Sequence, residues 1–374
     1  MSAETPGGWQ RDAFRDMGGA TAPPEPAPQQ PPQQPPQPPQ PRPSPPRARP
    51  PHRQEQPAPV SAPVVRPDVG KVPARRGDPF TRRAGRALRQ LLMSSASRDT
   101  AEATAAARAI QQPITTGRQI AVTSIRGGAG KTTVAALLAL AFAHYRTDSV
   151  LAVEADPALG TLPHRLGADQ VRWSAADLAR IVDPSMNITE VTGYLLPFTG
   201  ASGGPGGGWL LPGSQGAIGA ELDIDTYRIV MTSLRRYFGT TVVDCETLPA
   251  EVARTALTTT QARVLVAPAT PEGAAATRSV LDWMAGLHRS MLATTVVALT
   301  RSSPGMDLND RKAAAYLEAG GAMVVPLPYD RSLAAGGEIR GALLAEATRA
   351  AAARLAAETM NRAMSRGRGG GAPV

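Results

Sequence analysis

Short apolar runs of strand type alternate with amphipathic or alanine-rich segments of helix type from residue 118 onward. The runs are rich in β-branched residues and too short to be helices, which favours buried strands. They are Ile120–Thr123, Val150–Val153, Thr240–Cys245, Arg263–Pro268, Thr294–Thr300 and Met323–Asp330, the last including the exit from its strand. Helices are expected at Val134–Ala143, Asp225–Tyr237, Gly273–Leu287 and Ile339–Met364. This alternation predicts an α/β fold: a doubly wound, mostly parallel sheet with helices on both faces.

Weaker patterns predict three further elements. Trp173–Ile181 has the pattern of a short helix, and Ala101–Gln111 that of an alanine-rich helix. The glycine-rich segment Gly200–Gly219 is interrupted by Trp209–Pro212, which predicts a short strand.

The N-terminal part of the chain has a different composition. Residues 1–77 have no periodic hydrophobic pattern, and 20 of the 45 residues from Pro23 to Pro67 are proline. Such a stretch lacks amide donors and apolar side chains, so we expect a disordered, partly polyproline II extension. Two interpretations stay open: an inert spacer, or a docking segment for a protein partner that binds proline-rich sequence.

Residues 78–117 are interpreted as a helical lead-in to the main domain at 118–365, which a disordered tail at 366–374 follows. Within the lead-in, apolar residues recur at helical spacing among arginines between residues 80 and 92. Such a basic amphipathic helix can bind an acidic membrane or a partner. Packing against the adjoining domain is the commoner use of an apolar helix face, and we favour it.

Charge and cysteine content narrow the classes of function. Residues 1–100 contain 15 Lys and Arg against 8 Asp and Glu, so most of the net charge of +9 precedes the main domain. A basic segment of this kind can contact acidic partners or nucleic acid. The single cysteine, Cys245, excludes an intramolecular disulfide. No apolar run approaches the ~20 residues of a transmembrane helix, and the first residues lack the apolar core of a secretory signal. We therefore expect a cytoplasmic protein.

The stretch from Gln119 to Ala135, QIAVTSIRGGAGKTTVA, carries the chemistry. A strand run leads into a glycine loop, then into Lys131, Thr132 and an apolar helix, which is the context of a phosphate-binding loop. Glycines let several backbone N–H groups approach a phosphate, and the N-terminus of the following helix favours the negative charge. Lys131 can reach the β- and γ-phosphates, and the Thr132 hydroxyl can ligate Mg²⁺.

The use of lysine supports this interpretation. Only Lys71, Lys131 and Lys312 are lysines among 40 Lys and Arg residues. A lysine directly after the last loop glycine is therefore an unusual choice in this chain.

The loop Arg126-Gly127-Gly128-Ala129-Gly130-Lys131-Thr132 resembles the deviant loop KGGxGKT of the MinD/ParA family of P-loop NTPases, with Arg126 in place of the signature lysine. The resemblance implies ATP and Mg²⁺ as ligands and a homodimer that forms through the nucleotide site. It implies that Arg126 crosses that interface to the partner's phosphates, although arginine and lysine are not interchangeable at such sites.

Two acidic strand ends extend the resemblance. Glu154-Ala155-Asp156-Pro157 is similar to the family's DxDP motif, and Asp244 ends a run similar to the Walker B strand. By this match Asp156 orients the attacking water, Asp244 holds a water ligand of Mg²⁺ and Glu154 supports Mg²⁺ through water. The family's glycine after the Walker B aspartate is absent here, where Glu246 and Thr247 follow Cys245.

The resemblance also implies the nucleotide contacts. On the loop these are Gly127, Gly128, Ala129, Gly130, Lys131, Thr132 and Thr133, and on the adenine side they are Arg301, Pro328 and Asp330. Lys131, Asp156 and Arg126 are the implied catalytic residues, and Thr132, Asp244 and Glu154 the implied metal residues.

The resemblance covers residues 118–350 and is closest to the MinD-like ATPases of actinobacterial type VII (ESX) secretion, which also carry a proline-rich extension. It implies an ATP-hydrolysing switch that dimerises with nucleotide and regulates or positions a larger assembly, with type VII secretion as the candidate. One alternative is a ParA-type partition ATPase that binds DNA non-specifically through arginines such as Arg349, Arg354 and Arg362. The other is a nucleotide-binding scaffold with little turnover.

Overall fold

The computed structural model describes residues 62–63, 96–157, 160–199, 207–214, 220–304, 310–319 and 321–368. The basic helix expected at 80–92, the tail beyond residue 368 and all of the proline-rich extension except residues 62–63 lie outside the described residues. Those two residues form β1 (Ala62–Pro63), which pairs antiparallel with β4 (Gln170–Val171).

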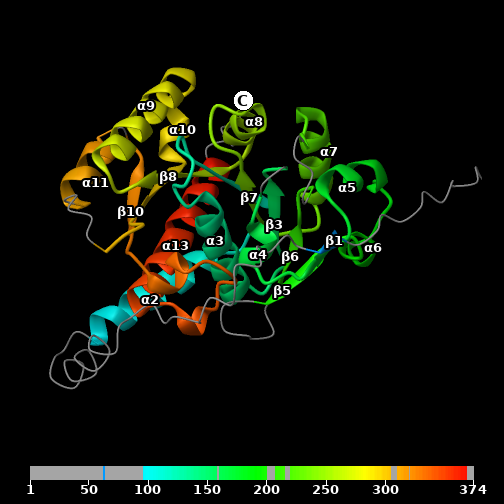
Figure 1. Ribbon diagram of the computed structural model, residues 1–374, viewed down its shortest axis with the longest axis horizontal. Coiled ribbons are helices and arrows are strands. Elements are labelled where there is room, and N and C mark those ends of the chain that lie inside the picture. The colour runs from blue at the N-terminus through cyan, green and yellow to red at the C-terminus, as the bar shows by residue number, and fades with distance from the viewer. Residues whose placement is uncertain are drawn as a thin grey trace, which may run out of the picture. The chain divides into compact units, whose positions relative to one another are not determined.

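Eight strands form the central sheet, in the order β10-β9-β8-β2-β7-β3-β6-β5 (Figure 1). Neighbouring strands are parallel, except that β5 runs antiparallel to β6 at one edge. In chain order the strands are β2 (Arg118–Thr123), β3 (Val150–Ala155), β5 (Leu196–Thr199), β6 (Gly207–Leu211), β7 (Thr240–Cys245), β8 (Ala262–Pro268), β9 (Thr295–Thr300) and β10 (Met323–Leu327). The expected doubly wound, mostly parallel sheet is confirmed.

Helices cover both faces of the sheet, which explains why the inner strands are apolar on both sides. One face packs against α3 (Lys131–Tyr145), α4 (Leu162–Arg165) and α13 (Glu346–Arg368). The other face packs against α5 (Ala175–Ile181), α6 (Ile188–Thr192), α7 (Ile224–Leu234), α8 (Glu251–Thr259), α9 (Pro271–Leu287), α10 (Arg289–Ala293) and α11 (Asp310–Glu318). Within this arrangement every residue of α3 from Val134 to Ala143 is buried.

The N-terminal helix α2 (Ala96–Ile110) packs on α13, and the two lie together in Figure 1. The side-chain amide of Gln112, just after α2, donates to the Asn361 side chain of α13 over 2.6 Å. The helix expected at Ala101–Gln111 is therefore present, and it begins five residues earlier.

The closing helix differs from its expected bounds. It was expected from Ile339, whereas the structure has a short 3-10 turn at Gly341–Leu343 and begins α13 at Glu346. The reason is a contact that the sequence pattern does not reveal: Asp330 accepts the backbone N–H of Ala345 over 2.8 Å, which fixes the chain just before the helix. Asp330 also caps the short helix α12 (Arg331–Ala334).

A fully buried arginine lies at the start of β8. Arg263 has no exposed surface, and its guanidinium donates to the carbonyls of Leu257 and Thr260 and to the Thr294 hydroxyl. These contacts tie the end of α8 to the residue before β9.

No helix in the described part of the chain is long and apolar enough to cross a membrane.

Candidate functional site

The loop between β2 and α3 has the backbone that a phosphate site requires. Gly128 and Gly130 have φ values of 75° and 90°, in the left-handed region that glycine adopts without strain. A Cβ atom placed on Gly127, Gly128 or Gly130 would meet no atom within 4 Å, so this stretch of backbone faces open space. Because α3 begins at Lys131, its N-terminus points at the same space.

The loop is held in place from two sides. The Ser124 hydroxyl donates to the Arg126 carbonyl over 2.8 Å, within the loop itself. The Thr300 hydroxyl, at the end of β9, donates to the Ala129 carbonyl over 2.9 Å. Sequence reasoning missed Thr300 as a support of the loop, because 171 residues separate it from Ala129 and only the strand order brings them together.

Asp244 lies beside the loop in the neighbouring strand. It pairs in register with Val122 of β2 and with Glu154 of β3, at the carboxyl ends of these strands. The side chain is completely buried, and neither carboxylate oxygen makes a hydrogen bond of normal geometry. Burial raises the pKa of Asp244 to about 7; the Thr132 hydroxyl and the Lys131 ammonium act in the opposite direction, and Asp156 adds to the rise.

Lys131, Thr132, Asp156 and Asp244 therefore gather at one edge of the sheet, as the sequence predicts. Lys131 and Thr132 stand at the start of α3 and are partly buried, as is Asp156 just after β3. Arg126 is exposed on the loop, so its side chain can extend away from the surface of the chain.

Glu154 uses both of its carboxylate oxygens within the protein. Oε1 accepts the Leu162 N–H over 2.8 Å, and Oε2 accepts the Gly213 N–H over 2.9 Å. Burial raises the pKa of Glu154 to about 8, against these two amides, with smaller contributions to the rise from Asp244 and Asp156. The carboxylate thus joins the segment that follows Asp156 to the segment that follows β6.

Two glycines make this arrangement possible. A Cβ on Gly160 would collide with the Glu154 carboxylate, and one on Gly213 would lie 2.9 Å from the Asp156 carbonyl oxygen. Real Cβ atoms do not come so close, so any larger residue would push the two segments away from Glu154.

The three residues expected on the adenine side lie at the same edge of the sheet, beyond β8. Arg301 follows β9, and its N–H donates to the Leu327 carbonyl at the end of β10 over 3.1 Å. Pro328 comes next and is partly buried. Asp330 is buried; Oδ1 accepts the Ser332 N–H over 2.7 Å, and Oδ2 accepts that of Ala345. Both carboxylate oxygens of Asp330 therefore already accept backbone N–H groups of its own chain.

The residues present fit a nucleotide phosphate with Mg²⁺. The open glycine backbone and Lys131 suit an anion, while the buried Asp244 carboxylate suits a cation or its water. In the described part of the chain no three His, Cys, Asp or Glu side chains form a metal cage. Mg²⁺ commonly keeps several waters and binds through one or two protein oxygens plus phosphates, so a cage is not needed.

The buried Asp244 carboxylate is expected to lower the stability of the nucleotide-free protein. We expect Asp244→Asn, which keeps the shape and removes the charge, to raise the free energy of unfolding without nucleotide by roughly 1–3 kcal/mol. Denaturant unfolding measures this. Asp225→Asn is the matched control, because the Asp225 side chain is 88% exposed, and it should change little. An Asp244→Asn chain less stable than wild type would show that the carboxylate has a partner.

Comparison with known proteins agrees with this geometry. Residues 120–335 match the family CbiA, the CobQ/CobB/MinD/ParA nucleotide binding domain, and the chain belongs to this family. The ESX-1 secretion-associated protein EspI of Mycobacterium tuberculosis, in both strains CDC 1551 / Oshkosh and ATCC 25618 / H37Rv, is 27% identical over 237 residues. That match covers 59% of this chain and 33% of EspI, so the chain spans about a third of the length of these curated relatives.

Solved structures show the same fold. The ParA family ATPase from Chlorobium tepidum TLS superposes with a TM-score of 0.52 at 17% identity, covering 64% of this chain and 98% of that one. The cell division ATPase MinD from Pyrococcus furiosus gives a TM-score of 0.48 at 21% identity, covering 66% and 98%. The family match and the superposition on the ParA family ATPase together show that the chain has the MinD/ParA form of the P-loop NTPase fold.

Proposed function

We propose that this protein is a Mg²⁺-dependent ATPase that dimerises when ATP is bound and regulates or positions a larger assembly in the cytoplasm. The observation that carries the proposal is the buried Asp244 carboxylate, whose oxygens make no hydrogen bond of normal geometry, next to an open glycine loop that ends in Lys131. A solvent-excluded acid of this kind costs free energy unless a ligand uses it.

Each residue has a distinct task in this proposal. The amides from Gly127 to Thr133 hold the phosphates, and Lys131 neutralises the charge that develops on the leaving group. When bound, Mg²⁺ supplies charge stabilisation at the β- and γ-phosphates; Thr132 would ligate it, and Asp244 would hold one of its waters. Asp156 orients the attacking water. Hydrolysis thus depends mainly on positioning and electrostatics.

Glu154 takes part indirectly. Sequence similarity suggests support of Mg²⁺ through water, but both oxygens already accept backbone amides. We propose that Glu154 positions Asp156 by holding the segment that follows it, and that any contact with metal-bound water is additional. On the adenine side Arg301 and Pro328 are the proposed contacts. Asp330 would act indirectly, by fixing the backbone at Ser332 and Ala345.

A substitution of Arg126 tests the proposed ATP-dependent dimerisation. We expect Arg126→Ala to bind ATP about as well as wild type but to lose most of its ATP-dependent dimer, because the exposed side chain would no longer reach the partner's phosphates. Light scattering with ATP and Mg²⁺ measures the dimer. Arg228→Ala is the control, because Arg228 lies on α7, is 61% exposed and is not among the proposed nucleotide contacts. If the Arg126→Ala chain dimerises like wild type, the proposed role of Arg126 in the partner's site is wrong.

The assembly is proposed from the relatives. The name of EspI associates that protein with ESX-1 secretion, and the match to it covers 59% of this chain. We propose a secretion apparatus as the larger assembly and a protein partner that binds the proline-rich extension. ATP binding would then control when the protein partner is bound.

DNA partition is the less favoured alternative, because α13 uses two of the three candidate arginines for packing. Arg349 donates to the Leu344 carbonyl over 2.7 Å, and Arg362 is partly buried and donates to the Ala293 carbonyl. Arg349 and Arg354 are exposed. Arginines whose guanidinium groups already donate to backbone carbonyls, as those of Arg349 and Arg362 do, are a weak basis for phosphate contacts along a duplex.

A further inference from the structure

A second pocket lies at the opposite edge of the sheet from the nucleotide loop. Its cavity of about 530 Å³ is lined by the segment that leads into β2 (residues 114–117), by Asp148 before β3, and by the end of α7 with the turn into β7 (residues 232–239). These segments precede the amino ends of three neighbouring strands. Because a six-residue strand spans about 20 Å, the pocket is separate from the nucleotide site.

Backbone hydrogen bonds and close packing fix the segments that line the pocket. Arg118 N–H donates to the Gly239 carbonyl over 2.9 Å, and Gly239 N–H donates to the Ser149 carbonyl over 3.0 Å. A Cβ on Gly117 would lie 2.6 Å from the Phe238 carbonyl oxygen, and one on Gly239 would collide with the Asp148 carboxylate. The chain thus uses glycine where the lining segments come closest.

The pocket carries positive charge without a matching carboxylate. Arg235 lines it and is exposed. Arg118 follows the lining residue Gly117 in the chain but does not itself line the pocket; it is 8% exposed, and donates to the Thr116 hydroxyl over 2.9 Å and to the Met364 sulfur over 3.5 Å. In the described part of the chain neither guanidinium contacts an acid. They are also near each other: burial and then the charge of Arg235 lower the pKa of Arg118.

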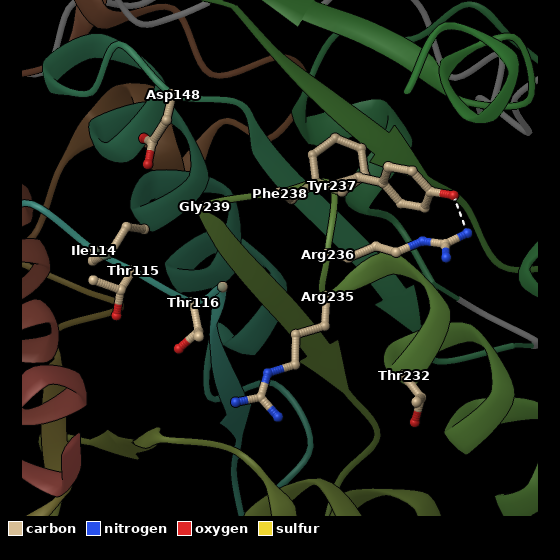
Figure 2. Close-up of a pocket in the computed structure, with 11 residues that line it drawn as sticks. Ile114, Thr115, Thr116, Asp148, Thr232, Arg235, Arg236, Tyr237, Phe238 and Gly239 are labelled. Atoms are coloured by element: carbon tan, nitrogen blue, oxygen red, sulfur yellow. Dashed lines mark hydrogen bonds between the residues drawn. The ribbon is translucent and has the colours of Figure 1, made fainter. Parts of the chain in front are cut away.

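The other charged groups of the pocket are already paired. Both oxygens of Asp148 accept the Arg146 guanidinium, over 2.6 and 2.7 Å, so this acid does not neutralise Arg118 or Arg235. The Arg236 guanidinium donates to the Tyr237 hydroxyl, and Figure 2 shows it turned away from Arg235 toward that ring. In the same view the Arg235 guanidinium points to the side of the pocket where Thr116 lies.

Hydroxyl donors complete the surroundings. Thr115, Thr116 and Thr232 line the same cavity. Thr116 accepts from Arg118, so its own proton is available to a ligand. The exposed guanidinium fork of Arg235, the nearby charge of Arg118 and the neighbouring hydroxyls together suit a doubly charged tetrahedral oxyanion better than a planar, singly charged carboxylate. The cavity volume is in the range of pockets for small organic molecules.

We propose that this pocket binds a small organic phosphate, whose phosphoryl group contacts Arg235 and the threonine hydroxyls, while the buried charge of Arg118 adds to the attraction. The ligand would bind to the segments that lead into β2, β3 and β7, and these same strands end in the nucleotide loop, Glu154 and Asp244.

The test uses phenyl phosphate as the probe and benzoate as its carboxylate counterpart, in calorimetric titrations of the full chain at fixed ionic strength. We expect phenyl phosphate to bind and Arg235→Ala to weaken binding roughly 10- to 100-fold. Arg228→Ala is the matched control, because Arg228 lies on α7 and its side chain is 61% exposed beside Asp225; this variant should bind like wild type. Lys131→Ala should also bind like wild type, which would locate the probe outside the nucleotide loop.

Four outcomes would overturn the proposal. Absence of binding at millimolar phenyl phosphate excludes the site. Equal binding by the Arg235→Ala chain, or loss of binding in the Lys131→Ala chain alone, places the probe elsewhere. Equal affinity for benzoate excludes phosphate as the preferred chemistry.

Discussion

Lys131→Ala should weaken ATP binding roughly 100-fold and abolish measurable turnover. The ammonium group is the one lysine charge at the loop, and hydrogen bonds to charged groups contribute about 1.5–3 kcal/mol each. A 100-fold loss corresponds to about 2.8 kcal/mol, at the upper end of this range, because the phosphates lose the positive charge of the ammonium group together with its hydrogen bond. Calorimetric titration with an ATP analogue and a phosphate-release assay measure the two effects.

Lys312→Ala is the matched control for this experiment. Lys312 is another of the three lysines, is exposed and lies on α11. Its removal should leave both affinity and turnover unchanged. Turnover at the wild-type rate in the Lys131→Ala chain would reject the proposed ATPase, whereas ATP binding without turnover in the wild-type chain would favour the scaffold alternative.

Arg263→Ala should destabilise the fold by about 3–5 kcal/mol, since it leaves buried acceptors without donors and opens a cavity. The side chain has no exposed surface and donates to Leu257, Thr260 and Thr294. Arg263→Met would fill much of the cavity without restoring the donors, so it should recover only part of the loss. Denaturant unfolding of both variants separates packing from hydrogen bonding.

Arg254→Ala provides the comparison, because Arg254 is exposed on α8, which ends next to the Arg263 guanidinium. This substitution should shift stability by less than about 0.5 kcal/mol. If Arg263→Met proved as stable as wild type, the hydrogen bonds of the guanidinium would not contribute to net stability, as happens for some buried charges.

The sheet was predictable because its strands are buried on both faces. The run Thr240–Cys245, for example, is rich in β-branched residues and buried at every position, and that strand has the expected bounds. The edge strand β5 (Leu196–Thr199) was not expected, since it contains Pro197 and only Phe198 is buried. Edge strands need less apolar sequence, and so they leave a weaker pattern.

The nucleotide loop was predictable for a related reason: its glycines and Lys131 lie within seven consecutive residues. The supports of the site were not, because they join distant segments. Thr300 reaches Ala129 across the sheet, and Glu154 holds amides of Leu162 and Gly213. Threonine at a strand end, or glycine in a glycine-rich loop, carries no local sign of such a partner.

The isolated Cys245 has a practical consequence. Its side chain is fully buried on the face of the sheet opposite the Asp244 side chain, and burial raises the pKa of its thiol further from neutrality. Since the chain has no other cysteine, a thiol introduced by Arg126→Cys or Arg235→Cys would be the reactive one. Fluorescent or spin labels could therefore report on either edge of the sheet without prior removal of the native sulfur.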